Sequence, residues 1–547
     1  MQADISGWTT RLTAEAVSRY TASGAWSGIT LGQSARERVS RTPDLVAVVD
    51  GSRQLCFSEL FSHASRLCAS LRRSGMRPGH VLSFQLPNWH ETLVINLAAC
   101  LGGFVCNPIV PIYRDAEVGF ILADCKARVL FVPETFRSID YAEMVERLRP
   151  GLPHLKDVVL VRARREGFAS YDDWAGTGSI ASQEAQLRAY DPDPNAVKLL
   201  LYTSGTTGNP KGVLHSHSSL RAEIDAVESF WALTKDDVVL MPSPVTHITG
   251  YLYALELAFV LGIKVVFMER WQPEDAAQLI AAHGVTFSIG ATPFLAELVY
   301  ELEIRGARLP TLRLFGCGGA PVPPEVIRRA GLVLPNCQAF RIYGSSEAPT
   351  VTLGVAAGDP KELGATTDGC IANHEVRIVD PESGLPVPPG TEGEILTRGP
   401  EMMLGYTDWQ HTLDAFDADG FFRTGDLGFL SHDRYLTISG RKKDLIIRGG
   451  ENISAREIED VLHRHPDILE AAVVAMPHER MGETPIAYVV LRPGRTLDLA
   501  ALRSFLDEAR VAKQKFPERL VALDELPRTA TGKVLKHVLR ARCRELA

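Results

Sequence analysis

LLYTSGTTGNPKGVLHSH, residues 200–217, places small hydroxyl-bearing residues, glycines and one lysine directly after the apolar run VKLLLY. The phosphate-binding loop of nucleotide hydrolases has a similar composition but reads G-x-x-x-x-G-K-[ST]. When Lys211 is aligned with the lysine of that pattern, Pro210 replaces its second glycine and Gly212 replaces its magnesium-binding hydroxyl residue. The stretch therefore predicts a loop that binds phosphates while its metal ligand comes from elsewhere in the chain.

The loop carries the groups that a polyphosphate needs. Hydroxyls and closely spaced backbone N–H groups donate hydrogen bonds to phosphate oxygens, and a lysine adds positive charge. A hairpin rich in glycine, threonine and proline that binds no ligand is the alternative. We expect phosphate contacts from these residues: Thr203, Ser204, Gly205, Thr206, Thr207, Gly208 and Lys211.

The composition limits the class of protein. A chain of 547 residues exceeds one hydrophobic core, so a large domain and at least one smaller domain are expected. The 45% hydrophobic and 23% charged residues exclude disorder, and no uncharged apolar run is long enough to span a membrane. A net charge of −8, with basic residues concentrated only near the end of the chain, argues against nucleic acid as a partner.

Targeting and cysteine patterns indicate a cytoplasmic protein. The first 20 residues include Asp4 and Glu15 and lack the apolar centre of a secretory signal. Nine scattered cysteines form no C-x-x-C pair, which favours reduced, buried thiols over disulfides or a zinc site.

The order of apolar and amphipathic segments predicts an α/β fold. Strand-like runs such as 128–133 and 157–161 alternate with helical patterns such as 65–75 and 274–284, which is typical of parallel sheets covered by helices. After residue 360, strands separated by proline and glycine turns predict a β subdomain. These patterns predict an α/β body with one or several parallel sheets, an attached β subdomain and a domain boundary close to Gly440.

Five further motifs follow the first one in order along the chain. They are GCGGAPV (316–322), RIYGSSE (341–347), TGDLG (424–428), GRKKDLIIRGGENI (440–453) and PRTATGK (527–533). With YTSGTTGNPKG, the series resembles the signatures of the adenylate-forming superfamily, which includes acyl-CoA synthetases, firefly luciferase and nonribosomal peptide synthetase adenylation domains. The chain is most similar to a medium-chain or cyclic or aromatic acyl-CoA synthetase. The resemblance implies an α/β fold with two stacked α/β subdomains and a β subdomain over residues 1–440, and a small mobile α+β lid over residues 441–547.

The resemblance implies a nucleotide site. Glu347, with the Thr203 hydroxyl, would bind Mg2+, which prefers such oxygens; a helix N-terminal carboxylate is the other interpretation of Glu347. Asp426 would accept the ribose hydroxyls and Arg441 would contact ribose or phosphate. The remaining ATP or AMP contacts that it implies are Gly318, Gly319, Ala320, Pro321, Tyr343, Gly344, Ser345, Ser346 and Lys533.

The resemblance also implies catalytic and acceptor residues. Lys533 would stabilise charge between the carboxylate and the α-phosphate, and Lys443 would be the hinge of the lid. Gly449 and Gly450 would leave a path for the pantetheine arm of CoA. His247 would gate the carboxylate tunnel and is grouped with Lys533 and Lys211 as catalytic, although a buried structural histidine is the alternative.

The acyl pocket is the least defined part. The resemblance places it around His247, Tyr251, Cys317 and Gly344, and the glycines Gly316, Gly318 and Gly344 suggest room for a compact apolar acid. We expect a medium-chain, alicyclic or aromatic carboxylate.

These features lead to one function and two alternatives. The expected function is an ATP-dependent carboxylate–CoA ligase that forms acyl-AMP and pyrophosphate, then acyl-CoA and AMP. An enzyme that loads an aryl or acyl group onto a carrier protein shares the first step, and a non-catalytic nucleotide sensor shares only the fold. The expected small molecules are ATP, Mg2+, CoA and a carboxylic acid, and a homodimer is a further expectation.

Overall fold

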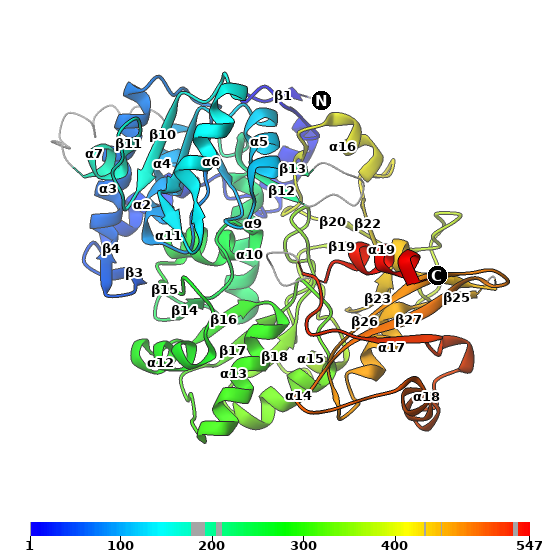
Figure 1. The fold of residues 1–547 in the computed structure, drawn as a ribbon. Coiled ribbons are helices and arrows are strands. Elements are labelled where there is room, and N and C mark those ends of the chain that lie inside the picture. Colours follow the sequence, from blue (N-terminus) through cyan, green and yellow to red (C-terminus); the bar gives the residue numbers. More distant parts are fainter. Residues whose placement is uncertain are drawn as a thin grey trace.

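The computed structural model describes residues 2–176, 192–203, 210–431, 434–449, 451–528 and 534–546. It confirms an α/β body with a β subdomain and a smaller C-terminal lid (Figure 1). Within these ranges, no helix combines the length and the apolar composition that crossing a bilayer requires. All nine cysteines are free, and only Cys56 is not fully buried, as predicted.

The first sheet of the body contains the two strands that the phosphate loop connects, β12 and β13. Its central strands are parallel, whereas β13 runs antiparallel to β12 and is extended by the short β21. In spatial order its strands are β11 (Ala169–Ser170), β10 (Asp157–Val161), β7 (Val129–Pro133), β5 (Val81–Phe84), β6 (Val105–Pro108), β12 (Val197–Thr203), β13 (Lys211–Ser216) and β21 (Gly405–Tyr406).

The second sheet is parallel except at one edge, where β4 pairs antiparallel with β3. Its strands consist mainly of buried apolar residues, as expected for strands covered on both faces. In spatial order they are β18 (Gln338–Arg341), β17 (Leu314–Cys317), β16 (Phe287–Gly290), β14 (Val238–Met241), β15 (Lys264–Phe267), β3 (Val46–Asp50) and β4 (Arg53–Cys56).

Helices cover both sheets and fill the space that they share. Helix α4 (His90–Gly102) is buried along its whole length and belongs to a core cluster with residues of both sheets. The other helices of the body are α1 (Ala14–Ala22), α2 (Leu31–Arg41), α3 (Phe57–Arg73), α5 (Asp115–Asp124), α6 (Tyr141–Leu148), α7 (Tyr171–Ala175), α9 (His217–Trp231), α12 (Pro273–His283), α13 (Thr292–Arg305), α14 (Pro324–Val333), α15 (Leu363–Thr366) and α16 (Trp409–Ala415).

The segment from 245 to 268 is a helical stretch followed by the buried strand β15. The helical part changes from α10 (Ile248–Gly250) to a π-helix (Tyr251–Glu256) and then to α11 (Leu257–Leu261). Short π-helical insertions within α-helices are frequent at functional sites. This one begins four residues after His247.

The β subdomain leads into the lid. Its antiparallel sheet contains β19 (Glu375–Val379), β20 (Gly393–Arg398), β22 (Phe422–Ser431) and β23 (Tyr435–Arg441). The lid sheet contains β24 (Ile446–Arg448), β25 (Glu451–Ile453), β26 (Ile468–His478), β27 (Gly482–Leu491) and β28 (Arg519–Ala522), with helices α17 (Ala455–Leu462), α18 (Leu499–Glu508) and α19 (Lys536–Leu546). The predicted boundary after residue 440 falls before the last residue of β23, and the lid sheet begins with β24 at Ile446.

The lid contacts the body through a buried charge cluster. Arg456 of α17 donates to Asp368 of the body at 3.1 Å, and Arg341 lies 3.5 Å from the same carboxylate. Ser454 caps α17 by accepting from the Glu457 N–H at 3.3 Å. The orientation of the lid in Figure 1 is therefore held by specific polar contacts.

Candidate active site

The phosphate loop connects two antiparallel strands. Thr203 at the end of β12 lies opposite Lys211 at the start of β13, and the Thr203 hydroxyl is 3.5 Å from the Lys211 carbonyl. The loop of nucleotide hydrolases instead leads from a strand into a helix. This loop is therefore not of the hydrolase type. The predicted contacts Ser204, Gly205, Thr206, Thr207 and Gly208 lie outside the described residues.

Lys211 and Glu347 meet at Tyr406. The Tyr406 hydroxyl donates to Oε1 of Glu347 at 2.9 Å, and the Lys211 ammonium lies 5.3 Å from the centre of the Tyr406 ring. Tyr406 is on β21, paired with Val213 of β13. The structure thus brings the predicted metal ligand close to the lysine of the phosphate loop.

Glu347 lies in a turn and not at the start of a helix, so the helix N-terminal interpretation is wrong. Its carbonyl accepts from the Met403 N–H at 2.9 Å, and the neighbouring Ser346 carbonyl is 2.7 Å from Nε2 of His215. The Ser345 hydroxyl accepts from the Glu347 N–H at 3.2 Å. A half-buried carboxylate on a fixed backbone offers the kind of oxygen ligand that Mg2+ prefers.

The predicted nucleoside residues also come together. The Tyr343 hydroxyl donates to Oδ2 of Asp426 at 2.7 Å, and Nε of Arg441 donates to Oδ1 at 2.7 Å. Asp426 and Arg441 are direct partners on β22 and β23. Burial, reinforced by the Asp426 charge, raises the pKa of Tyr343, so its hydroxyl stays a donor at neutral pH. The predicted adenine, ribose and lid residues thus form one network.

The segment 318–321 follows β17 and lies at the carboxyl end of a parallel sheet, where ligands of α/β folds bind. Gly319 has φ +80° and open space where a Cβ would stand. Such a residue lets the backbone approach a flat ring. Ala320 and Pro321 continue this turn.

Three glycines do not enlarge the acyl pocket as expected. A Cβ at Gly344 would lie 1.8 Å from the Pro349 carbonyl oxygen, and one at Gly318 would lie 2.7 Å from the Ile342 carbonyl oxygen. A Cβ at Gly316 would approach the Ile289 side chain to 3.3 Å. The chain itself occupies these spaces: close backbone packing accounts for Gly318 and Gly344, and neighbouring side chains lie against Gly316.

Within the described ranges, His247 has an unpartnered ring nitrogen, as a group that contacts a ligand would have. It is the N-cap residue of α10, and its Nε2 is buried without a hydrogen-bond partner among the described residues. The neighbouring Thr246 hydroxyl is also buried and unpartnered within this part of the chain. Burial lowers the pKa of His247 to about 4, so the ring is neutral at pH 7. Cys317 is fully buried at the end of β17.

Tyr251 takes part in a different cluster. Its hydroxyl donates to Oδ1 of Asn96 at 2.6 Å, and the ring centre lies 5.5 Å from the Lys198 ammonium. Lys198 in turn forms a buried ion pair with Glu256 at 2.6 Å. The Tyr251 hydroxyl and ring thus belong to this polar cluster, while its backbone N–H donates to the His247 carbonyl at 2.8 Å.

The predicted lid residues are described only in part. Lys443 lies in the short 3-10 turn Lys442–Asp444, and its carbonyl accepts from Arg540 of α19. Gly449 has φ +61°, and a Cβ there would be 2.7 Å from the Met481 methyl group. Gly450 and Lys533 lie outside the described residues.

Sequence reasoning missed the buried Glu223. Its Oε1 accepts from the Tyr253 hydroxyl at 2.6 Å and from the Thr350 hydroxyl at 2.5 Å. Tyr253 lies in the π-helix that follows His247. A polar residue on the largely buried face of α9 was the only available signal, because its partners are far away in sequence.

Glu223 should make the stability of the fold depend on pH. Burial raises its pKa from 4.5 to about 7, although the two hydroxyls act in the opposite direction. The folded state then binds more protons than the unfolded state between these values, so stability falls as pH rises from 4.5 to 7, by about 3 kcal/mol.

Glu223→Gln should remove this loss of stability. Urea unfolding midpoints at pH 5 and pH 8 measure the loss in the wild type, in Glu223→Gln and in the control Glu166→Gln, which changes an exposed carboxylate. An equal pH dependence of stability in all three proteins would contradict the raised pKa of Glu223.

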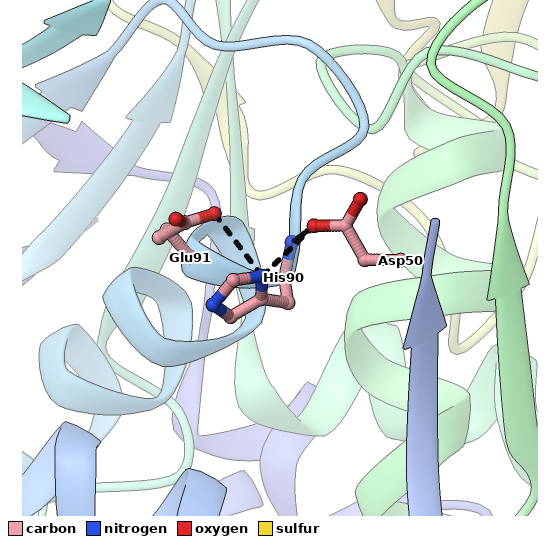
Figure 2. Close-up of side chains that lie close together, drawn as sticks. All are labelled: Asp50, His90 and Glu91. Atoms are coloured by element: carbon pink, nitrogen blue, oxygen red, sulfur yellow. Dashed lines mark hydrogen bonds and ion pairs between the residues drawn. The ribbon is translucent and has the colours of Figure 1, made fainter. Parts of the chain in front are cut away.

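One cluster outside the site resembles a metal site. Figure 2 shows His90 between Asp50 and Glu91, with Nδ1 2.8 Å from Oδ2 of Asp50 and 3.4 Å from Oε2 of Glu91. Arg162 donates to both carboxylates, and its guanidinium lies 4.2 Å from the Trp89 ring centre. Because Arg162 already supplies the positive charge, the cluster is an ion-pair network that ties the start of α4 to β3.

Comparison with known proteins agrees with this geometry. The family model described as AMP-binding enzyme matches residues 35–407, and that of the AMP-binding enzyme C-terminal domain matches residues 457–533. The chain therefore belongs to the AMP-binding enzyme family. Family membership confirms three predictions: that the chain is an adenylate-forming enzyme, that its fold is α/β, and that it is an AMP-forming acid–thiol ligase.

Three relatives show the range of the likeness. The chain is 36% identical to a medium-chain fatty-acid–CoA ligase of Escherichia coli over 95% of this chain and 92% of the relative. It is 35% identical to a salicyl-AMP ligase/salicyl-S-ArCP synthetase of Mycobacterium tuberculosis over 96% and 93%. The crystal structure of ATP-bound MatB from Rhodopseudomonas palustris has a TM-score of 0.82 at 27% identity, covering 95% and 100%.

Proposed function

We propose that this chain is an ATP-dependent carboxylate–CoA ligase. A carboxylate oxygen attacks the α-phosphorus of ATP and pyrophosphate leaves, which gives acyl-AMP; the thiol sulfur of CoA then attacks the acyl carbon, loses its proton and displaces AMP. The observation that carries the proposal is the placement of Lys211 and Glu347 around Tyr406, beside the network of Tyr343, Asp426 and Arg441.

The residues of the chain supply alignment and charge in this scheme. Lys211 neutralises phosphate oxygens, while Asp426 and Arg441 orient the ribose. Mg2+ bound through Glu347 and Thr203 would neutralise further phosphate charge. Nε2 of the neutral His247, which has no hydrogen-bond partner among the described residues, orients the substrate carboxylate or closes the tunnel through which that substrate enters.

The acyl substrate is proposed to be a compact acid. The relatives named for a medium-chain fatty acid and for salicylate support a medium-chain, alicyclic or aromatic carboxylate. Cys317 is fully buried and His247 is half-buried, which favours an apolar acyl group over a charged one.

Loading of a carrier protein is the second candidate. The 35% identity to the salicyl-S-ArCP synthetase supports it, because that relative spans the same length of chain. A non-catalytic nucleotide sensor has less support, since Glu347 and Lys533 are both present. The proposed homodimer is tested by light scattering of the purified protein.

Pyrophosphate release over a panel of acids, with and without CoA, tests the function. We expect release with medium-chain or aromatic acids, followed by an acyl-CoA product and AMP when CoA is added. Turnover that requires a carrier protein and ignores CoA would favour the second candidate, and no release with any acid would overturn both.

A further inference from the structure

Tyr406 occupies a rigid position at the edge of the first sheet. The residue before it, Gly405, has φ +136° and a Cβ there would lie 3.0 Å from the Thr412 hydroxyl oxygen. That same hydroxyl accepts from the Tyr406 N–H at 2.8 Å. Strand pairing with Val213 and contact with the first turns of α16 thus fix the backbone from two sides.

The Tyr406 side chain touches two charged groups at once. Its hydroxyl donates to Oε1 of Glu347, and its ring faces the Lys211 ammonium at 5.3 Å, within the range of a cation–π contact. Only 5% of Tyr406 is exposed.

The hydrogen bond orients a carboxylate whose backbone is already fixed. Met403 holds the Glu347 carbonyl, and Ser345 holds its N–H, independently of Tyr406. Within the described part of the chain, Oε2 of Glu347 accepts no hydrogen bond. A bond to Oε1 alone therefore fixes the rotation of the carboxylate and leaves Oε2 available to a cation.

We propose that Tyr406 is a positioning residue that orients the Glu347 carboxylate for Mg2+ with its hydroxyl and steers the Lys211 ammonium with its ring. The inference rests on the proposed function, because it takes Glu347 as the metal ligand and Lys211 as a phosphate contact. Groups that hold a metal ligand in place commonly contribute as much as 10- to 100-fold to metal affinity.

Tyr406→Phe tests the hydroxyl alone, since the ring remains. Mn2+ binding to the protein with a non-hydrolysable ATP analogue, followed by electron paramagnetic resonance, should weaken roughly 10-fold. The half-saturating Mg2+ concentration for pyrophosphate release should rise by the same factor, while binding of the metal-free analogue stays unchanged. Glu347→Gln should show a larger effect of the same kind.

Tyr435→Phe is the matched control. It removes another buried tyrosine hydroxyl that donates to a carboxylate, that of Asp359 at 2.6 Å, away from Lys211 and Glu347. It should leave metal binding unchanged. Unchanged Mn2+ binding in Tyr406→Phe, or an equal loss in Tyr435→Phe, would overturn the role of the hydroxyl.

Tyr406→Leu tests the ring. It should weaken binding of the metal-free ATP analogue several-fold beyond Tyr406→Phe, because Lys211 loses its cation–π partner. Equal analogue binding in the two variants would overturn the role of the ring. A wild-type protein that releases no pyrophosphate with any acid would instead count against the proposed function, since the Mn2+ titration reads the metal site without turnover.

Discussion

Lys533→Ala should slow acyl-AMP formation by roughly 100- to 1,000-fold, the usual effect of removing one group that stabilises transition-state charge. Negative charge develops between the carboxylate and the α-phosphate only in the first step. Thioester formation from supplied acyl-AMP should therefore keep nearly the wild-type rate. Single-turnover measurement of each half-reaction separates the two effects.

The control for Lys533 is another lysine of the lid. Lys513 is exposed in a 3-10 turn at Lys513–Lys515, and Lys513→Ala should change neither half-reaction. An equal loss of both half-reactions in Lys533→Ala would show that this lysine supports the fold of the lid and not the first transition state.

The sequence predicts the fold well because its signals are local. Buried strands such as β10 and β15 consist almost entirely of β-branched and other apolar residues, and the Ser454 cap is visible three residues before Glu457. The change to a π-helix at Tyr251 is not visible in this way. It accompanies a buried ion pair between Glu256 and Lys198, two residues that are 58 positions apart.

The candidate site could be predicted in its residue types but not in its contacts. The motifs identify Glu347, Asp426 and Arg441, and the structure shows the pairing of β22 with β23 that joins two of them. Tyr406 is 59 positions from Glu347, and nothing in the sequence around it indicates that the two side chains meet. Gly344 shows the opposite kind of error. Its lack of a side chain suggests space for a substrate, whereas the Pro349 carbonyl oxygen occupies the position that a Cβ would need.

The hinge proposal predicts that one substitution separates the two half-reactions. Lys443 lies in a 3-10 turn, whose φ of roughly −50 to −70° proline can adopt. If the lid rotates about this residue, its second orientation needs another backbone torsion, which proline forbids. Lys443→Pro should therefore preserve one half-reaction and reduce the other by orders of magnitude.

We expect adenylation to survive in Lys443→Pro, because that lid position brings Lys533 to the phosphates. Lys443→Ala is the control, since alanine leaves every torsion accessible and both half-reactions should persist. A thermal melt establishes that the proline variant is folded. Parallel retention or parallel loss of both half-reactions in a folded protein would mean that the lid does not rotate about Lys443, because a rigid turn would tolerate proline equally in both steps or fail equally in both.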